Sequence, residues 1–358
     1  MFKKNENGKD DETVKAARLK KIGTRNALVD NVKGLVVLLY MVDHAILHMP
    51  KDGYAASPWW GHSNPVLIPS WGFNIIDLGP ILFFFVIGLV YFSSFLRKYE
   101  TDGRAAYKQA VSRNLAFMGL FLGLMYFTGA VEKPAALWNT VPSIGFASLL
   151  AVPFLIPQIS KSAVWKGVLG VGVLMFYHFF HEKLFALFAY IPFEHQSGEV
   201  ENLVHAGGMA ACVGYLGIIL LSGAIADVSK KGIIPYEVLT ALLYVSGRLC
   251  SVLVPPSYPD MNVTWMFSAL TKINLFYFGF YLLDKLFLKG REIPILAAMG
   301  RNIFLYLFIV LIFQGIFAVF NFPVAHNRTE AFWIVAVISV VYIIIAISLQ
   351  KSKVIFKL

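Results

Sequence analysis

Residues 74–96 read NIIDLGPILFFFVIGLVYFSSFL, an almost unbroken run of apolar side chains in which Asp77 is the one charged residue. About 20 mostly apolar residues are needed for an α-helix to cross the hydrocarbon core of a bilayer. This run therefore predicts a membrane-spanning helix. The composition of the 358-residue chain agrees, because 58% of its residues are hydrophobic and 15% are charged, whereas about a quarter are charged in soluble domains.

Nine further apolar stretches accompany this one, which makes ten candidate membrane helices. They lie at roughly 32–48, 114–131, 143–158, 164–181, 203–226, 234–253, 263–284, 294–320 and 330–350. No polar gap between them is long enough for a second core. The sequence therefore predicts an all-α, polytopic helix bundle in the membrane, with a polar tail at 1–31, one transmembrane domain at 32–350 and a short tail at 351–358.

Lysine and arginine predict how these helices are oriented, because cytoplasmic loops are enriched in both residues. With a cytoplasmic N-terminus, 24 of the 31 Lys and Arg residues fall on the cytoplasmic side and four on the other side. We therefore expect both termini in the cytoplasm. The same bias accounts for the net charge of +10, so we expect no nucleic-acid partner.

Histidine is distributed in the opposite way. All eight histidines of the chain map to the outer half of the membrane or to outer loops in this topology: His44, His48, His62, His178, His181, His195, His205 and His326. Chance and the interfacial preference of the side chain are one explanation. The functional explanation is proton transfer on the extracytoplasmic side, for which the imidazole has a suitable pKa.

The first predicted helix carries a polar stripe. Residues 30–48 read DNVKGLVVLLYMVDHAILH, in which Lys33 and His44 are eleven residues apart. At ~100° and ~1.5 Å per residue, both lie on one face of a helix, with His44 about 16 Å beyond Lys33. Charged groups within a membrane are candidate functional sites. The alternative is a lysine that extends to the cytoplasm and a histidine that is bound by a neighbouring helix.

Further polar residues in the predicted spans are candidates. Asp77 lies near the outer end of the second span. It either orients a histidine or binds a substrate hydroxyl, or it caps its helix. Arg301 and Asn302 lie in the ninth span. Arg248 in the seventh span and Lys272 in the eighth add further positive charge. Buried positive groups suit an anionic ligand such as phosphate, and pairing of these groups with Glu237 or Asp284 is the structural alternative.

Several of these residues resemble motifs of membrane enzymes. The run Val29, Asp30, Asn31, Val32, Lys33 and Gly34, followed by His44, resembles the LDxxRG…H start of transmembrane acyltransferases. Trp71, Asp77, Pro80 and the FFFVIG run that ends at Gly88 are similar to the second-helix motif of the heparan-alpha-glucosaminide N-acetyltransferase family. A third set of residues resembles the eighth and ninth helices of that family: Asn262, Trp265, Ser268, Asp284, Gly300, Arg301, Asn302 and Tyr306.

The resemblance implies an enzyme that takes an acetyl or other acyl group from cytoplasmic acyl-CoA and transfers it to a sugar or glycan acceptor across the membrane. Three positions depart from the pattern, because Val29 and Lys33 stand where the first motif has Leu and Arg, and the third departure concerns the expected histidine. The family's proposed catalytic histidine lies three residues before the Trp of the second-helix motif, and here that place is Ile68. The imidazole must then come from His44 or, from the enlarged outer loop, from His62.

We therefore expect Lys33 and Arg301 to hold the CoA phosphates, and Asn302 to line the path of the pantetheine arm or to bond a neighbouring helix. His44 is the expected base, with His62 in reserve, and Asp77 orients the imidazole or binds the acceptor. Direct transfer in a ternary complex and a route through an acyl-His intermediate both fit these residues. No metal is expected.

The main alternative is a secondary transporter of a small anionic or sugar-like solute, since charges near the midplane are also natural in transporters. No inverted repeat is evident, and a transporter gives no reason for histidines to gather on one side. A structural or sensory protein is disfavoured by the polar stripe. We expect an integral protein of a bacterial plasma membrane whose active site opens to the extracytoplasmic side, and the sequence leaves a homodimer open.

Overall fold

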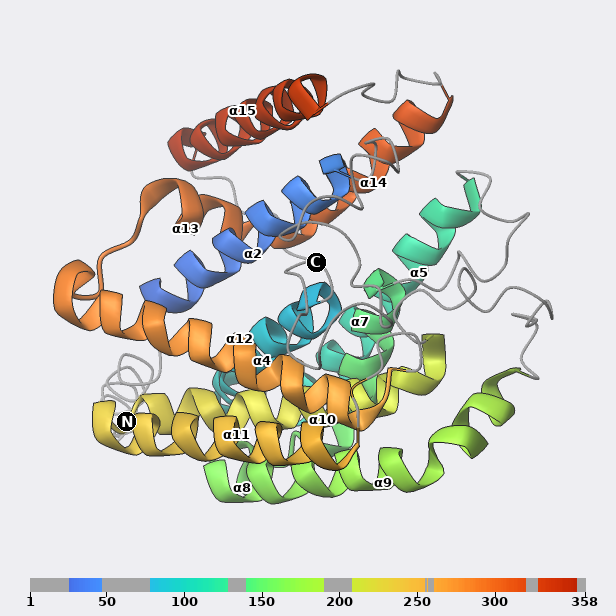
Figure 1. Ribbon diagram of the computed structural model, residues 1–358, viewed down its shortest axis with the longest axis vertical. Coiled ribbons are helices and arrows are strands. Elements are labelled where there is room, and N and C mark those ends of the chain that lie inside the picture. The colour runs from blue at the N-terminus through green and yellow to red at the C-terminus, as the bar shows by residue number, and fades with distance from the viewer. Residues whose placement is uncertain are drawn as a thin grey trace, which may run out of the picture.

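The structure is a computed structural model that describes residues 26–46, 78–127, 140–189, 208–254, 256, 261–319 and 328–352. Its regular elements are helices, and no strand occurs in these ranges (Figure 1). The helices are α2 (Ala27–Ile46), α4 (Gly79–Asp102), α5 (Ala105–Phe127), α7 (Thr140–Leu150), η3 (Val152–Phe154), α8 (Pro157–Ser160), α9 (Ala163–Ala189), α10 (Gly208–Ser229), α11 (Ile233–Leu253), α12 (Val263–Leu283), η6 (Asp284–Leu288), α13 (Pro294–Arg301), α14 (Ile303–Val319) and α15 (Arg328–Ser352).

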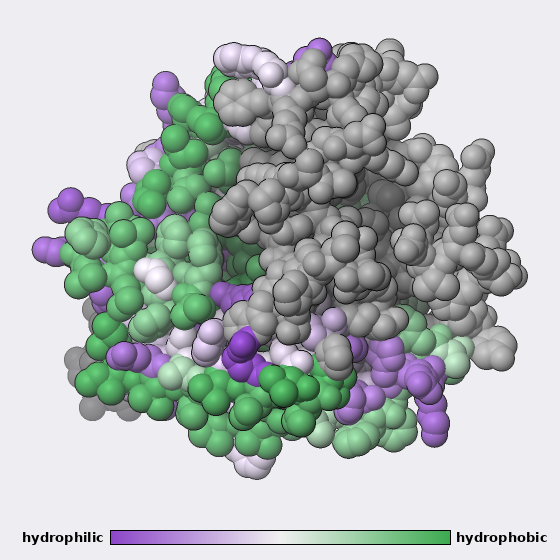
Figure 2. Space-filling view, viewed as in Figure 1, coloured by the Kyte–Doolittle hydropathy of each residue, from purple (hydrophilic) through white to green (hydrophobic). Residues whose placement is uncertain are grey.

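Five of the described helices are long and apolar enough to cross a membrane: Gly79–Asp102, Ala163–Leu187, Gly208–Ser229, Ile233–Leu253 and Val263–Leu288. Helices α9 and α11 also expose many large apolar side chains. Figure 2 shows hydrophobic residues over the lower part of the described surface, where these two helices lie. A large exposed apolar surface of this kind suits lipid rather than water. The protein is therefore an integral membrane protein.

Helix α10 forms the centre of the bundle. It packs against α4, α7 and α9, and 17 of its 22 residues are buried. Gly88 allows α4 to approach it closely, because a Cβ at this position would lie 2.5 Å from the Ile219 carbonyl oxygen. Small residues at helix crossings commonly let membrane helices pack at short range. Helix α4, which carries much of the site described below, is thereby fixed against the core.

Each of the ten predicted spans contains a helix in the structure, but two differ from the expected form. The stretch at 143–158 is interrupted after Leu150, because Pro153 and Pro157 cannot continue an α-helix, and η3 and α8 follow. The stretch at 294–320 is divided at Asn302 into the short helix α13 and the longer helix α14. The number of spans and the side of the termini stay predictions.

Helices α2 and α13 cross in close contact, and this crossing positions the site. A Cβ at Gly34 would overlap the Leu296 carbonyl oxygen, and a Cβ at Gly300 would overlap the Asp30 carbonyl oxygen. The backbones of the two helices are therefore in direct contact. Asn31 adds two hydrogen bonds, because its amide donates to the Arg291 carbonyl (3.3 Å) and its Oδ1 accepts from the Ile293 N–H (2.9 Å). The DNVKG and GRN sequences, from opposite ends of the chain, thus lie side by side.

Candidate functional site

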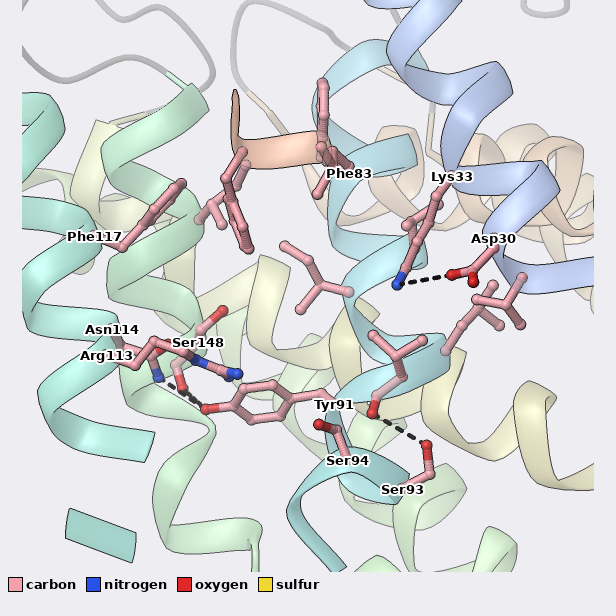
Figure 3. Close-up of a pocket in the computed structure, with 18 of the residues that line it drawn as sticks. Asp30, Lys33, Phe83, Tyr91, Ser93, Ser94, Arg113, Asn114, Phe117 and Ser148 are labelled. Atoms are coloured by element: carbon pink, nitrogen blue, oxygen red, sulfur yellow. Dashed lines mark hydrogen bonds and ion pairs between the residues drawn. The ribbon is translucent and has the colours of Figure 1, made fainter. Parts of the chain in front are cut away.

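A cavity of about 440 Å³ opens among helices α2, α4, α5, α7 and α14. Its size lies within the range of roughly 300–1,000 Å³ that is usual for small-molecule sites. Figure 3 shows side chains of α2 and α4 on one side of it and those of α5 and α7 on the other. These helices come from distant parts of the chain, from α2 near its start to α14 near its end, so the site forms only in the folded protein.

Four basic residues line this cavity: Lys33, Arg97, Arg113 and Lys230. Asp30 is the one acidic residue among the described lining side chains. All four basic residues belong to the stretches that the sequence assigns to the cytoplasmic side. The cavity therefore has a positive end that suits an anionic ligand entering from that side.

The other end of the cavity is apolar. Phe83, Phe117, Phe304 and Leu307 line it, and Figure 3 shows Phe83 and Phe117 above Tyr91, Asn114 and Arg113. Phe83 and Arg97 are fourteen residues apart on α4, which corresponds to roughly 21 Å along the helix. The cavity thus follows α4 from a basic end to an apolar end. It can hold a ligand that is charged at one end and uncharged at the other.

A buried hydrogen-bond network lies beside the basic residues. The Tyr91 hydroxyl donates to the Ser148 carbonyl (2.6 Å) and accepts from the Asn114 amide (2.9 Å), so that α4, α5 and α7 are joined here. All three residues are buried and line the cavity. These bonds fix the wall of the cavity, because breaking one would leave a buried polar group unsatisfied.

Lys33, one of the predicted ligand-binding residues, lies in the cavity. Its ammonium is 3.9 Å from the Asp30 carboxylate, one helical turn earlier on α2. The Lys33 side chain is largely buried. The prediction that Lys33 contacts an anionic ligand stays untested, and its position in the lining agrees with it.

Arg301 and Asn302 lie just behind the cavity, outside its described lining. The Arg301 guanidinium pairs with Glu292, and its Nε lies 3.7 Å from the Asp30 carboxylate. These acids, rather than Glu237 or Asp284, are its partners. The buried Asn302 amide donates to the Ala298 carbonyl (3.0 Å), which caps the end of α13. A role in binding the donor stays a prediction for both residues.

The predicted catalytic residues are less completely described. His44 lies in the last turn of α2, eleven residues after Lys33, and its side chain is outside the description. Asp77 and His62 both lie outside the described residues. Their catalytic roles therefore stay predictions.

Three basic residues of the cavity were not among the predicted site residues: Arg97, Arg113 and Lys230. The sequence counts them only as cytoplasmic charges that orient the helices. A signal was nevertheless present, because each lies at the predicted cytoplasmic end of an apolar stretch. Which helix ends converge could not be read from the sequence.

No protein-family model matches this chain, and no curated protein matches it.

Proposed function

We propose that the protein is a membrane-bound acyltransferase that moves an acetyl or other acyl group from cytoplasmic acyl-CoA to a sugar or glycan acceptor on the extracytoplasmic side. The observation that carries the proposal is the cavity with a basic end and an apolar end. Acyl-CoA has the same division, because its phosphates lie at one end and its acyl thioester lies at the other. The resemblance of Asp30, Lys33, Gly300 and Arg301 to acyltransferase motifs agrees with this function.

In this proposal the basic residues Lys33, Arg97, Arg113 and Lys230 bind the phosphates of the donor. Arginine suits this task because its planar guanidinium forms paired, charge-assisted hydrogen bonds with phosphate. The pantetheine arm then extends along α4 toward Phe83 and Phe117. The donor is a substrate rather than a resident cofactor, and no metal is required.

The chemistry takes place beyond the apolar end. The acceptor's hydroxyl oxygen or amine nitrogen attacks the thioester carbonyl carbon, the C–S bond breaks, and CoA leaves as a thiolate that takes up the proton which the base removed from the acceptor. His44, about 16 Å along α2 from Lys33, accepts the acceptor's proton. Asp77 orients the imidazole or binds the acceptor, and His62 is the alternative base. A histidine that carries the acyl group between donor and acceptor fits the same arrangement.

The test is binding and turnover with the purified full-length protein in detergent. Titration calorimetry should detect acetyl-CoA binding, and thiol release should depend on an added sugar acceptor. Arg113→Gln should weaken acetyl-CoA binding about tenfold, the effect of roughly one charge-assisted hydrogen bond. Arg104→Gln is the matched control, since Arg104 is exposed in the turn after α4 and lies outside the cavity lining.

Transport of a small anionic or sugar-like solute is the competing function, because a basic cavity in a membrane bundle also suits an anionic substrate. Proteoliposomes distinguish the two. Uptake of a labelled anion without any thiol release from acetyl-CoA would favour the transporter. Acceptor-dependent thiol release without uptake would favour the acyltransferase. Mass spectrometry of cell-surface glycans, with and without the gene, would then identify the acceptor.

A further inference from the structure

Both lysines of the cavity have an acidic neighbour three residues earlier in the chain. Lys33 lies 3.9 Å from Asp30 on α2, and Lys230 lies 3.3 Å from Asp227 at the end of α10. An isolated pair of this kind has no net charge. Each lysine would then attract an anionic ligand only weakly, because the neighbouring carboxylate competes for the same ammonium.

Each carboxylate also contacts a second cation from a different helix. Asp30 contacts Arg301 of α13, with 3.7 Å between carboxylate oxygen and Nε, and Asp227 pairs with Lys166 of α9. Neither Arg301 nor Lys166 is among the described residues that line the cavity. Two charged groups therefore flank the site. One is a group of three, Lys230, Asp227 and Lys166, and the other is a group of four, because Arg301 also pairs with Glu292.

Lys166 is the most buried member of these groups, with a relative exposure of 1%. Its ammonium donates to the Ser160 carbonyl (3.0 Å) and to the Asp227 carboxylate, and lies 5.0 Å from the centre of the Phe92 ring. The Lys230 side chain, by contrast, is 55% exposed. Lys166 thus bonds the Asp227 carboxylate from inside the bundle, whereas Lys230 lines the cavity.

We infer that Lys166 is a positioning residue for the anionic ligand of this cavity, and that it acts through Asp227 and Lys230. Lys166 neutralises the Asp227 carboxylate, so the group of three keeps one net positive charge at the cavity. It also restrains the carboxylate at the end of α10. Lys230 donates one hydrogen bond to this carboxylate (3.3 Å), which leaves its other ammonium hydrogens for the ligand. The inference rests on the proposed function only in taking the ligand to be an anion.

The test compares the binding of CoA and of inorganic pyrophosphate to the purified full-length protein by titration calorimetry. Lys166→Met leaves Asp227 to neutralise Lys230, so affinity for both probes should fall about tenfold. The double variant Lys166→Met with Asp227→Asn regains one net positive charge and should bind within about threefold of the unchanged protein. Lys161→Met, an exposed change at the end of α8, is the matched control and should have no effect.

A structural role for Lys166 that does not involve Asp227 would not be corrected by removing Asp227 as well. Equal affinity in Lys166→Met and the unchanged protein would overturn the inference, as would a double variant that binds as weakly as the single one. If Lys166→Met does not fold, Asp227→Asn decides the question, because it should bind pyrophosphate at least as tightly as the unchanged protein, and weaker binding would overturn the inference.

The two probes also separate this inference from the proposed function. Binding of pyrophosphate without binding of CoA would refute the acyl-CoA donor, and the variants would still be compared with pyrophosphate. Binding of neither probe would overturn both the donor and the role of Lys166.

Discussion

Asp30 and Arg301 face each other across the α2–α13 crossing, with 3.7 Å between a carboxylate oxygen and the guanidinium Nε. Asp30 also lies 3.9 Å from Lys33 in the cavity. One carboxylate therefore connects the basic end of the cavity to the crossing of the two helices. An arginine in this position can affect a ligand without contacting it.

Arg301→Ala should weaken CoA binding about tenfold, because the loss of Arg301 leaves both Asp30 and its other partner Glu292 to lower the positive charge at Lys33. Adding Asp30→Asn separates an indirect effect from a direct one. If Arg301 acts through Asp30, the double variant recovers affinity, and if Arg301 itself binds the phosphate, it does not. Unchanged affinity in Arg301→Ala would make the residue purely structural. Titration calorimetry with CoA measures all three variants.

The glycine contact between α2 and α13 leads to a second prediction. Gly34→Ala places a methyl group on the Leu296 carbonyl and should lower stability by at least about 1–3 kcal/mol, the usual effect of overpacking. Gly119→Ala on α5 is the control, since no atom lies within 4 Å of its added Cβ, and its effect should stay within about 1 kcal/mol. Thermal unfolding in detergent compares them. Equal melting temperatures of Gly34→Ala and Gly119→Ala would contradict the direct contact between the backbones of α2 and α13.

Topology gives a third prediction. In a background without Cys212 and Cys250, a cysteine at position 230 should react with a membrane-impermeant reagent only after the cells are opened. A cysteine at position 183, an exposed site on α9, should react in intact cells. Both expectations follow from the excess of Lys and Arg on the cytoplasmic side. Labelling of position 230 from outside would reverse the orientation and place the basic end of the cavity on the wrong side for acyl-CoA.

The helices could be predicted from the sequence because each apolar run is a local property of the chain. The interruptions at Pro153 and Asn302 were missed, since mean hydropathy does not register a break within an apolar stretch. Lys33 could be proposed as a site residue because it shares a helix face with His44. Arg113 and Lys230 could not, because their convergence depends on how α5 and α10 pack.

The same reason explains why the acidic partners of Arg301 could not be predicted. Glu292 lies just before α13, and Asp30 lies across the contact with α2. That contact depends on Gly34 and Gly300, whose pairing no local pattern indicates. The motifs at the two ends of the chain suggested a common function, and their side-by-side packing supplies a physical reason why they occur together.

His44 gives the last prediction, which addresses the chemistry. A general base in acyl transfer typically contributes about 10²–10⁴-fold to the rate, so His44→Ala should lose turnover by this factor. It should still fold and bind acetyl-CoA normally, because the phosphate-binding residues lie near the other end of α2 and on α4, α5 and α10. Thiol release and calorimetry measure the two properties separately.

His62→Ala is the matched comparison, since it removes the same side chain from the outer loop. Loss of turnover in His62→Ala, with near-normal turnover in His44→Ala, would move the base to that loop. Normal turnover in both would refute a mechanism based on either histidine. If His44→Ala is inactive, mass spectrometry of the unchanged protein mixed with acetyl-CoA alone distinguishes the two routes, because an acyl-His intermediate adds one acetyl group to the protein and a ternary-complex mechanism adds none.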